Sequence, residues 1–421
     1  MTGNLLRRSI LSLIAAGLVL AACNNTTTND PGPTTAFAVL RLTSTGAVDT
    51  SFAGGRGIAL TDFDTGLFDF ALAVAVQPDN KIIAGGSTGL AGQGVIALAR
   101  YNTDGSPDAG FGTAGTGGLV RTPTPAGWTS AFASAIAVQP DSKIVVAALA
   151  FNSGTTGIVV LRYNTNGTLD TTFNTTGIAP IATIGPGFAT DTCALALQGT
   201  NIIVAGATSD GKIVLYRYDM NGAPDTAFGT DPGGGKTTTP IGVGVQAVSP
   251  ALAFQSTGSI IVATGNGADQ VILRYSATGI LDTAFGTNGI VTTNAGGTDF
   301  ANAVAVQQVA GVPALSDKIV VAGHANVNFT LGTSDVSLVR YNADGTLDTT
   351  FNPAGPTPGT VITDLGGFDN VFSVALQGTN IIVAGATSDG NIVLYRYDMS
   401  GALDPAFGTG GKTTTPIGVG V

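Results

Sequence analysis

The chain has 421 residues and a formal net charge of −10, only 10% of its residues are charged, and every acidic residue is Asp. Without Glu and with few Lys it is poor in residues that favour helices, and without a clustered Lys/Arg surface it is a poor nucleic-acid binder. One His and two Cys argue against a zinc enzyme, and 44% hydrophobic residues argue against global disorder.

The first 22 residues have the pattern of an export signal. Arg7 and Arg8 precede an apolar run from Ile10 to Leu20 that is too short to span a bilayer, and small residues then lead to Cys23. The Leu-Ala-Ala-Cys sequence resembles the lipobox of bacterial lipoproteins, which implies that the Cys23 thiol is lipidated and that Cys23 starts the mature chain. The alternatives are an ordinary secretory signal with a chance Cys or, more faintly, a twin-arginine export signal.

We therefore expect three regions: a lipoprotein signal peptide over residues 1–22, a polar tether over 23–35 and a folded domain over 36–421. Acyl chains contribute roughly 0.8 kcal/mol per buried CH₂, so a lipidated Cys23 would hold the exported domain at a membrane. Asn24 is not the Asp that the lipoprotein pattern associates with inner-membrane retention, so the expected location is the outer membrane or the cell surface. Cys193 is then left without a partner, and its apolar surroundings predict a buried, inert thiol.

Two signatures repeat along residues 36–421. The first is Arg, an aromatic residue or Leu, a turn with Gly, then Asp and Phe, and it starts at Arg41, Arg100, Arg162, Arg217, Arg274, Arg340 and Arg396, about 59 residues apart. The second is an alternating apolar segment ending in Gln, a short turn and another apolar segment; its glutamines are Gln77, Gln139, Gln198, Gln255, Gln307 and Gln377.

Each unit predicts four strands, here called A to D in chain order. The segments AVAVQ (A), KIIVAG (B) and IALARY (C) and the weaker GIVTT type (D) are rich in Val, Ile and Thr and are bounded by Gly, Asn, Asp and Pro. No helical spacing of apolar residues appears outside the signal. Radially repeated four-stranded antiparallel sheets are typical of an all-β β-propeller, and a solenoid is the alternative.

The segments AVAVQPDNKIIAGG and RYNTDGSPDAGFG, with their copies, resemble the delta-60 repeat family of bacterial β-propellers over about residues 36–421. The resemblance implies a surface or secreted propeller without a general enzymatic activity, and the strand order is similar to that of NHL-type propellers.

Closure of the ring is the open question of the sequence. Residues 36–42 and 57–60 supply only strands C and D, six complete units follow, and residues 412–421 are identical to 236–245. The alternatives are a six-bladed ring with an appended hairpin and a ring of seven-fold curvature with one incomplete blade; we favour the second.

The recurring Arg, Asp and Phe predict a structural latch in each blade. The Asp lies eight residues after the Arg and the Phe three residues later, so the Asp would cap the turn, the Phe would plug the gap between blades and the Arg would bind a carboxylate or carbonyls. The predicted latch carboxylates are Asp49, Asp108, Asp170, Asp225, Asp282, Asp348 and Asp404.

Two further patterns suggest ligands. Asn102, Asp104 and Asp108 give a turn that could bind calcium weakly, although its Gly falls at position four rather than six. The D-to-A loops carry Asp69, Asp191, Asp299, Asp369 and Trp128, which could bind a cation, a sugar or a peptide on one rim, or could simply cap loops and cover the core. His324 stands alone and makes a poor metal site.

The sequence therefore favours a lipid-anchored cell-envelope propeller that binds a protein or glycan through rim loops, without catalysis, without a cofactor and without nucleic acid. A propeller enzyme acting on extracellular carbohydrate or peptide, with paired carboxylates on one blade, and a truncated, non-functional copy are the alternatives.

Overall fold

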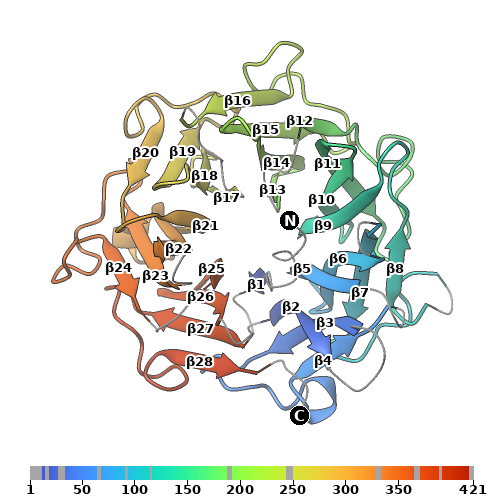
Figure 1. Ribbon diagram of the computed structural model, residues 1–421, viewed down its shortest axis with the longest axis horizontal. Coiled ribbons are helices and arrows are strands. Elements are labelled where there is room, and N and C mark those ends of the chain that lie inside the picture. The colour runs from blue at the N-terminus through green and yellow to red at the C-terminus, as the bar shows by residue number, and fades with distance from the viewer. Residues whose placement is uncertain are drawn as a thin grey trace.

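The computed structural model describes residues 12–14, 19–26, 34–63, 68–90, 93–113, 116–186, 192–242, 250–328, 333–364, 370–387 and 391–416. The strands of these residues form seven four-stranded sheets, and all their pairings are antiparallel. Figure 1 shows the sheets arranged radially around a central axis, which confirms the predicted all-β propeller. We number them blades 1 to 7 in chain order.

Blades 2 to 7 are the six complete repeats, and each is a simple meander of neighbouring strands. Blade 2 contains β5 (Phe68–Val76), β6 (Ile82–Gly89), β7 (Val95–Tyr101) and β8 (Leu119–Thr122). Blade 3 contains β9 (Ser130–Val138), β10 (Ile144–Asn152), β11 (Thr155–Tyr163) and β12 (Ala182–Pro186). Blade 4 contains β13 (Ala194–Gln198), β14 (Asn201–Ala207), β15 (Lys212–Tyr218) and β16 (Lys236–Pro240).

The second half of the ring has the same plan. Blade 5 contains β17 (Ala251–Phe254), β18 (Ile260–Gly265), β19 (Gln270–Tyr275) and β20 (Ile290–Thr293). Blade 6 contains β21 (Phe300–Gln307), β22 (Lys318–Asn328), β23 (Thr333–Tyr341) and β24 (Thr360–Thr363). Blade 7 contains β25 (Asn370–Gln377), β26 (Asn380–Ala386), β27 (Ile392–Tyr397) and β28 (Lys412–Thr415).

Blade 1 differs from the others in where its strands come from. The predicted half-blade is present as β3 (Thr34–Arg41) and β4 (Ile58–Thr61). Its two inner strands are β1 (Ser12–Ile14) and β2 (Val19–Thr26), from the residues predicted as signal and tether. In the backbone register Cys23 lies opposite Phe37. The described sheets therefore have seven-fold curvature, and strands β1 and β2 fill the place left open by the repeats.

The strands are buried on both faces because neighbouring blades stack face to face. In β10 Val145, Ala147 and Leu149 pack into one apolar cluster. The alternate residues Ile144, Val146 and Ala148 pack into the cluster on the other side. This period of two follows from the pleat of a strand, and it explains why the B and C segments read as continuous apolar runs. The core is thus a ring of inter-blade layers.

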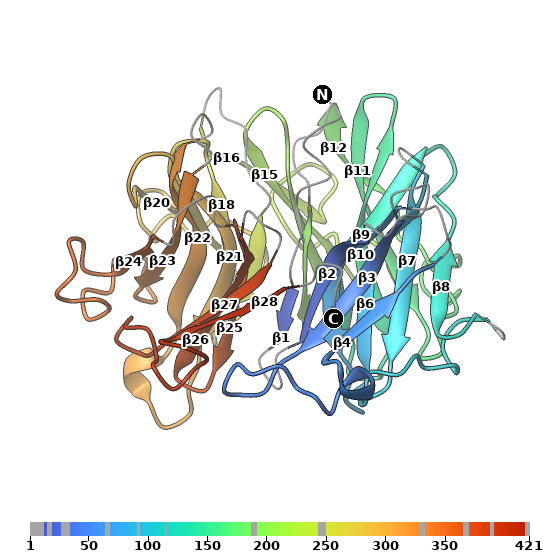
Figure 2. The same ribbon diagram turned by 60° about the horizontal axis from the view of Figure 1, so that its bottom comes forward.

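The meander gives the propeller two distinct faces. Successive strands run in opposite directions, so the A–B and C–D connections share one face and the B–C and D–A connections share the other (Figure 2). The described residues contain two short 3₁₀ helices, η2 (Ala53–Gly55) in a C–D connection and η3 (Pro313–Leu315) in an A–B connection. Among the described residues no helix has the length and apolarity needed to cross a membrane.

Candidate functional site

The recurring Arg, Asp and Phe form one latch in each blade, seven in the described ring. In every latch a guanidinium nitrogen of the Arg lies 2.7–2.9 Å from Oδ2 of the Asp eight residues later. The other carboxylate oxygen accepts a hydrogen bond from the backbone N–H two residues after the Asp, as in Thr172 N to Asp170 Oδ1 at 3.1 Å. The Asp therefore caps its own turn while it holds the Arg.

The Phe of each latch lies under the guanidinium and against the next blade. The Arg Cζ is 4.4–4.8 Å from the centroid of the ring, which is cation–π geometry. The other side of the ring touches the Gly of the next C–D turn: a Cβ added at Gly401, where φ is +90°, would lie 3.0 Å from Phe351. Glycine is needed there both for the backbone conformation and for the close approach.

Each latch also binds the following blade through Nη1 of its Arg, which donates to a backbone carbonyl in the next C–D turn. The acceptors in chain order are Thr103, Thr165, Met220, Ala277, Ala343, Met399 and Ser44. The last of these bonds runs from Arg396 in blade 7 to Ser44 in blade 1, at 2.6 Å. The series of latches therefore closes on itself.

In blades 2, 4 and 7 the glutamine that ends strand A accepts a hydrogen bond from the latch Arg. Gln377 Oε1 accepts from Arg396 Nη1 at 2.9 Å. In blade 4 Gln198 Oε1 accepts from Arg217, and its Nε2 donates to the Gly258 carbonyl of blade 5 at 3.2 Å. In these three blades the second recurring signature thus contacts the same Arg as the first.

Three latches contain a lysine that the sequence analysis missed. Lys81, Lys143 and Lys318, at the start of strand B, lie 2.8–3.0 Å from the latch Asp of their own blade. Burial alone would raise the pKa of Asp348, but its hydrogen bonds from Thr350 and Lys318 and the charge of Arg340 lower it to about 2. The Asp348 carboxylate is therefore ionised at neutral pH. An alignment of the repeats would have shown that a lysine recurs just before or at the start of strand B.

A tyrosine–threonine contact between blades was also missed. In blades 2, 3, 6 and 7 the Tyr that follows the latch Arg bonds through its hydroxyl to the last Thr of strand D in the preceding blade. The pairs are Tyr101 with Thr61, Tyr163 with Thr122, Tyr341 with Thr293 and Tyr397 with Thr363, at 2.6–2.9 Å. At the seam between blades 7 and 1 the corresponding residues are Leu42 and Thr415, and the buried Thr415 Oγ1 has no hydrogen-bond partner.

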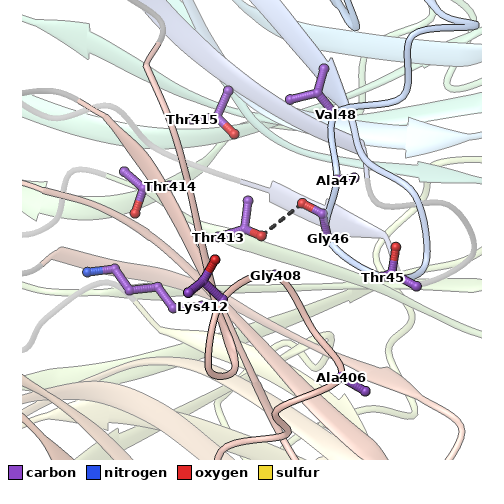
Figure 3. A pocket seen from close by; sticks show the side chains of 11 residues that line it. Thr45, Gly46, Ala47, Val48, Ala406, Gly408, Lys412, Thr413, Thr414 and Thr415 are labelled. Carbon is purple, nitrogen blue, oxygen red and sulfur yellow. Dashed lines mark hydrogen bonds between the residues drawn. The ribbon is translucent and has the colours of Figure 1, made fainter.

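The same seam holds a cavity of about 460 Å³ between the first C–D turn and β28. Figure 3 shows Val48 and Thr415 on one side of it, and the hydrogen bond of 2.8 Å from Thr413 Oγ1 to the Gly46 carbonyl that crosses it.

We expect Leu42→Tyr to stabilise the fold by about 1 kcal/mol, because the hydroxyl of the new tyrosine would pair with the buried Thr415. Urea unfolding measures the effect. Leu42→Phe is the matched control, and an equal gain for Phe would contradict the prediction.

The predicted calcium turn is tied together by its own side chains. Asp104 Oδ1 accepts from the backbone N and the hydroxyl of Ser106, at 2.9 and 2.6 Å. Asp108 belongs to the latch of blade 2. Within the described ranges, no group of three or more His, Cys or Asp side chains is placed to hold a metal ion. Weak calcium binding stays a prediction.

Three of the five predicted rim residues lie in the described part of the chain, and Asp191 and Asp369 lie outside it. Asp69 and Asp299 belong to blades 2 and 6, which are not neighbours, and both side chains are fully buried. Asp69 Oδ2 accepts from Phe63 N at 2.8 Å, and Asp299 Oδ2 accepts from the backbone N–H groups of Ala295 and Gly296. These two carboxylates therefore organise their own D–A loops.

Trp128 lies on the same face in the loop before β9. Its side chain is half-buried and packs over the apolar cluster between blades 2 and 3. A Cβ added at Gly157 of β11 would lie 2.6 Å from the edge of the indole. Trp128 thus covers the core and still keeps an exposed part at the rim.

Burial raises the pKa of Asp299 to about 6, against an ordinary value of 3.8. Because the folded protein binds this proton more tightly than the unfolded chain, the contribution of Asp299 to stability rises as the pH falls from 7 to about 4. We expect Asp299→Asn, which can still accept from the loop, to be more stable than the wild type at pH 7 and to show a smaller gain at pH 4.5. Urea unfolding at the two pH values measures this; an unchanged pH dependence would contradict it.

The contacts of His324 and the burial of Cys193 indicate structural roles for both side chains. His324 Nε2 accepts from Val371 N at 2.8 Å, which joins blade 6 to blade 7. Asn302 Nδ2 lies 3.2 Å from His324 Nδ1 and donates to the Val371 carbonyl. Cys193 is buried, as predicted, and burial raises the pKa of its thiol to about 12. Its thiolate is therefore scarce at neutral pH.

The chain is similar to several solved structures at low sequence identity. A Lactobacillus plantarum protein is 14% identical over 91% of this chain and 93% of its own, with a TM-score of 0.48. The BP39L lectin of Burkholderia pseudomallei is 14% identical over 96% and 99%, also at 0.48, and an α-L-arabinanase of Penicillium chrysogenum is 10% identical over 78% and 92%, at 0.46. At these identities none of them carries a function over to this chain. No curated protein matches it.

One family model matches six segments of the chain. Its description is "Domain of unknown function (DUF5122) beta-propeller", and the matched residues are 26–52, 77–111, 139–173, 201–228, 315–351 and 380–407. Each matched segment ends at a latch Phe, so the family model follows the same repeat as the latches. Together with the radial sheets, these matches support the assignment of the chain to a bacterial β-propeller repeat family.

Proposed function

We propose that the protein is a lipid-anchored β-propeller of the cell envelope, built of delta-60 repeats, that acts as a non-catalytic binding or scaffold module. The observation that supports the proposal is that the recurring polar residues bind one another and the next blade. In all seven latches the Arg is bound on one side to its own Asp and on the other to the next blade, so this repeated chemistry serves rigidity. A rigid ring leaves recognition to its loops.

The binding face of the proposal is the one that carries the B–C and D–A connections. The B–C loops differ between blades: β10 and β11 are joined by a tight turn, whereas β22 and β23 extend much further than β18 and β19. Trp128 lies on this face and keeps an exposed part, and exposed aromatic side chains stack on sugars and peptides. A protein or glycan at the cell surface is the partner class that fits this arrangement.

The binding proposal is tested with glycan and peptide arrays. The probe is the purified protein without residues 1–22, with and without calcium, and the matched variant is Trp128→Ala. We expect a defined set of sugars or peptides to bind, and the variant to lose most of the signal while it unfolds cooperatively like the wild type. Binding that is unaffected by Trp128→Ala would place the site elsewhere, and turnover of an array ligand would overturn the non-catalytic role.

The anchor is tested separately through Cys23. We expect the wild-type protein to sediment with membranes, to lack residues 1–22 by mass spectrometry and to carry acyl chains on Cys23, because two or more chains are needed for stable anchoring. Cys23→Ser should abolish both lipidation and removal of residues 1–22. A wild-type protein that remains in the soluble fraction without lipid would contradict the anchor.

A further inference from the structure

The inner half of blade 1 is held in a different way from that of every other blade. In blades 2 to 7 strands A and B come from the repeat itself, whereas in blade 1 their places are taken by β1 and β2. The pairing of β2 with β3 is continuous, from Val19 opposite Arg41 to Thr26 opposite Thr34. One strand, β2, therefore covers the whole inner edge of β3, and β1 pairs with the other edge of β2.

The outer half of blade 1 is fixed without that segment. Towards blade 7, Gly408 N donates to the Thr45 carbonyl at 2.8 Å, and Leu40 packs with Leu394 and Phe407. Towards blade 2, Ala53 N donates to the Asp104 carbonyl at 2.7 Å. Strands β3 and β4 are thus held on both sides by contacts that do not involve β1 or β2.

Processing at Cys23 would uncover the inner edge of β3. Removal of residues 1–22 takes away β1 and the part of β2 that pairs with Ala38–Arg41. The acyl chains on Cys23, which lies opposite Phe37, would then have to reach a membrane, so the rest of β2 leaves the sheet with them. What remains is a row of unpaired backbone groups beside side chains that are now buried, such as Phe37 and Val39.

The uncovered edge admits one kind of occupant. Its place is held in the described chain by two extended strands, β2 and β1, which both contact β5, and β1 also contacts β25 (Figure 1). An extended segment is therefore the shape that fits it. The neighbouring β25 carries no charged residue, and the single charge of β5, Asp69, is buried against its own loop. An uncharged, apolar strand therefore matches the surroundings.

We propose that in the processed protein the inner edge of β3 is a β-augmentation site that takes an extended apolar segment of a partner protein, antiparallel to Thr34–Arg41. The proposal rests on the proposed processing at Cys23. Main-chain hydrogen bonds to β3 supply the affinity, and the apolar strands β5 and β25 favour apolar side chains on the bound segment. In the unprocessed chain residues 19–26 occupy the same edge, so the site opens only after the signal has been removed.

The test compares the lipidated protein extracted from membranes with the unprocessed Cys23→Ser chain. The probe is a labelled synthetic peptide with the sequence of residues 12–22 and a solubilising Lys tag, and the control peptide carries Pro in place of Leu20. We expect the peptide to bind the processed form and to slow amide exchange at Ala38–Arg41. The Pro peptide and the unprocessed chain should bind at least about ten-fold more weakly, because Pro lacks the amide that the ladder needs.

Three outcomes would overturn the proposal. The first is equal binding to both forms, and the second is strong protection of Ala38–Arg41 in the processed protein without peptide. The third is concentration-dependent self-association that protects the same amides, since the occupant would then be a second copy. A membrane protein that still carries residues 1–22 would defeat the proposed processing together with this site, whereas processed protein without binding defeats only the site.

Discussion

Replacing Arg162 with alanine should lower the free energy of unfolding by about 3–5 kcal/mol, because it removes one of the two cations that neutralise the buried Asp170 and leaves only Lys143 and Thr172 as its partners. Arg162 and Asp170 are 5% and 3% exposed, their side chains are joined at 2.7 Å, and the same guanidinium binds the Met220 carbonyl of blade 4. One substitution therefore weakens a blade and the contact with its neighbour together.

Thermal and urea unfolding measure the effect of Arg162→Ala. The control is Lys212→Ala, which removes an exposed ion pair with Asp210 and should cost less than about 1 kcal/mol. If Arg162→Ala were as mild as the control, the latches would not hold the blades together, and the structural role of the repeat signature would fail.

Phe351→Ala should be as damaging, at about 3–5 kcal/mol, since the ring is fully buried and its loss leaves a cavity between blades 6 and 7. The ring supports the Arg340 guanidinium at 4.4 Å and fills the space against Gly401. The blades are rigid sheets, so the gap cannot collapse easily.

The matched control for Phe351→Ala is Met399→Ala. Met399 offers its backbone carbonyl to Arg340, while its side chain is 44% exposed, so its truncation should change stability by no more than about 0.5 kcal/mol. We also expect the double variant Arg340→Ala/Phe351→Ala to lose less than the sum of the single losses, because the two side chains share one contact. Additive losses would mean that the latch is not a unit.

The repeating parts of the molecule could be predicted from the sequence because they depend on local spacing. The period of two in segments such as Ile144–Asn152 fixes strands that are buried on both faces. The Arg and Asp eight residues apart meet because the C–D turn brings them to adjacent positions, as in Asp170 N to Arg162 O at 2.9 Å. The pairing within a blade is therefore visible in the chain itself.

The contacts between blades could not be predicted in the same way. The partner of Tyr163 is Thr122, in the preceding blade, and only the ring geometry brings the two together. The direction of a carboxylate is equally hidden: Asp299 looks like a rim ligand in sequence, but the free amides of Ala295 and Gly296 turn it inwards. The strand over Val19–Thr26 could not be predicted either, because the apolar residues of an export signal and those of a strand have the same composition.

All latches have the same direction around the ring, because each Arg donates a hydrogen bond to the blade that follows it. Arg396 donates to the Ser44 carbonyl of blade 1 just as Arg41 donates to the Thr103 carbonyl of blade 2. Any blade thus presents the same donor side to its successor and the same acceptor turn to its predecessor. Blades are in this sense interchangeable modules, and copying a stretch of several repeats creates no interface that must be redesigned. The identity of residues 236–245 with 412–421 is what such copying leaves behind.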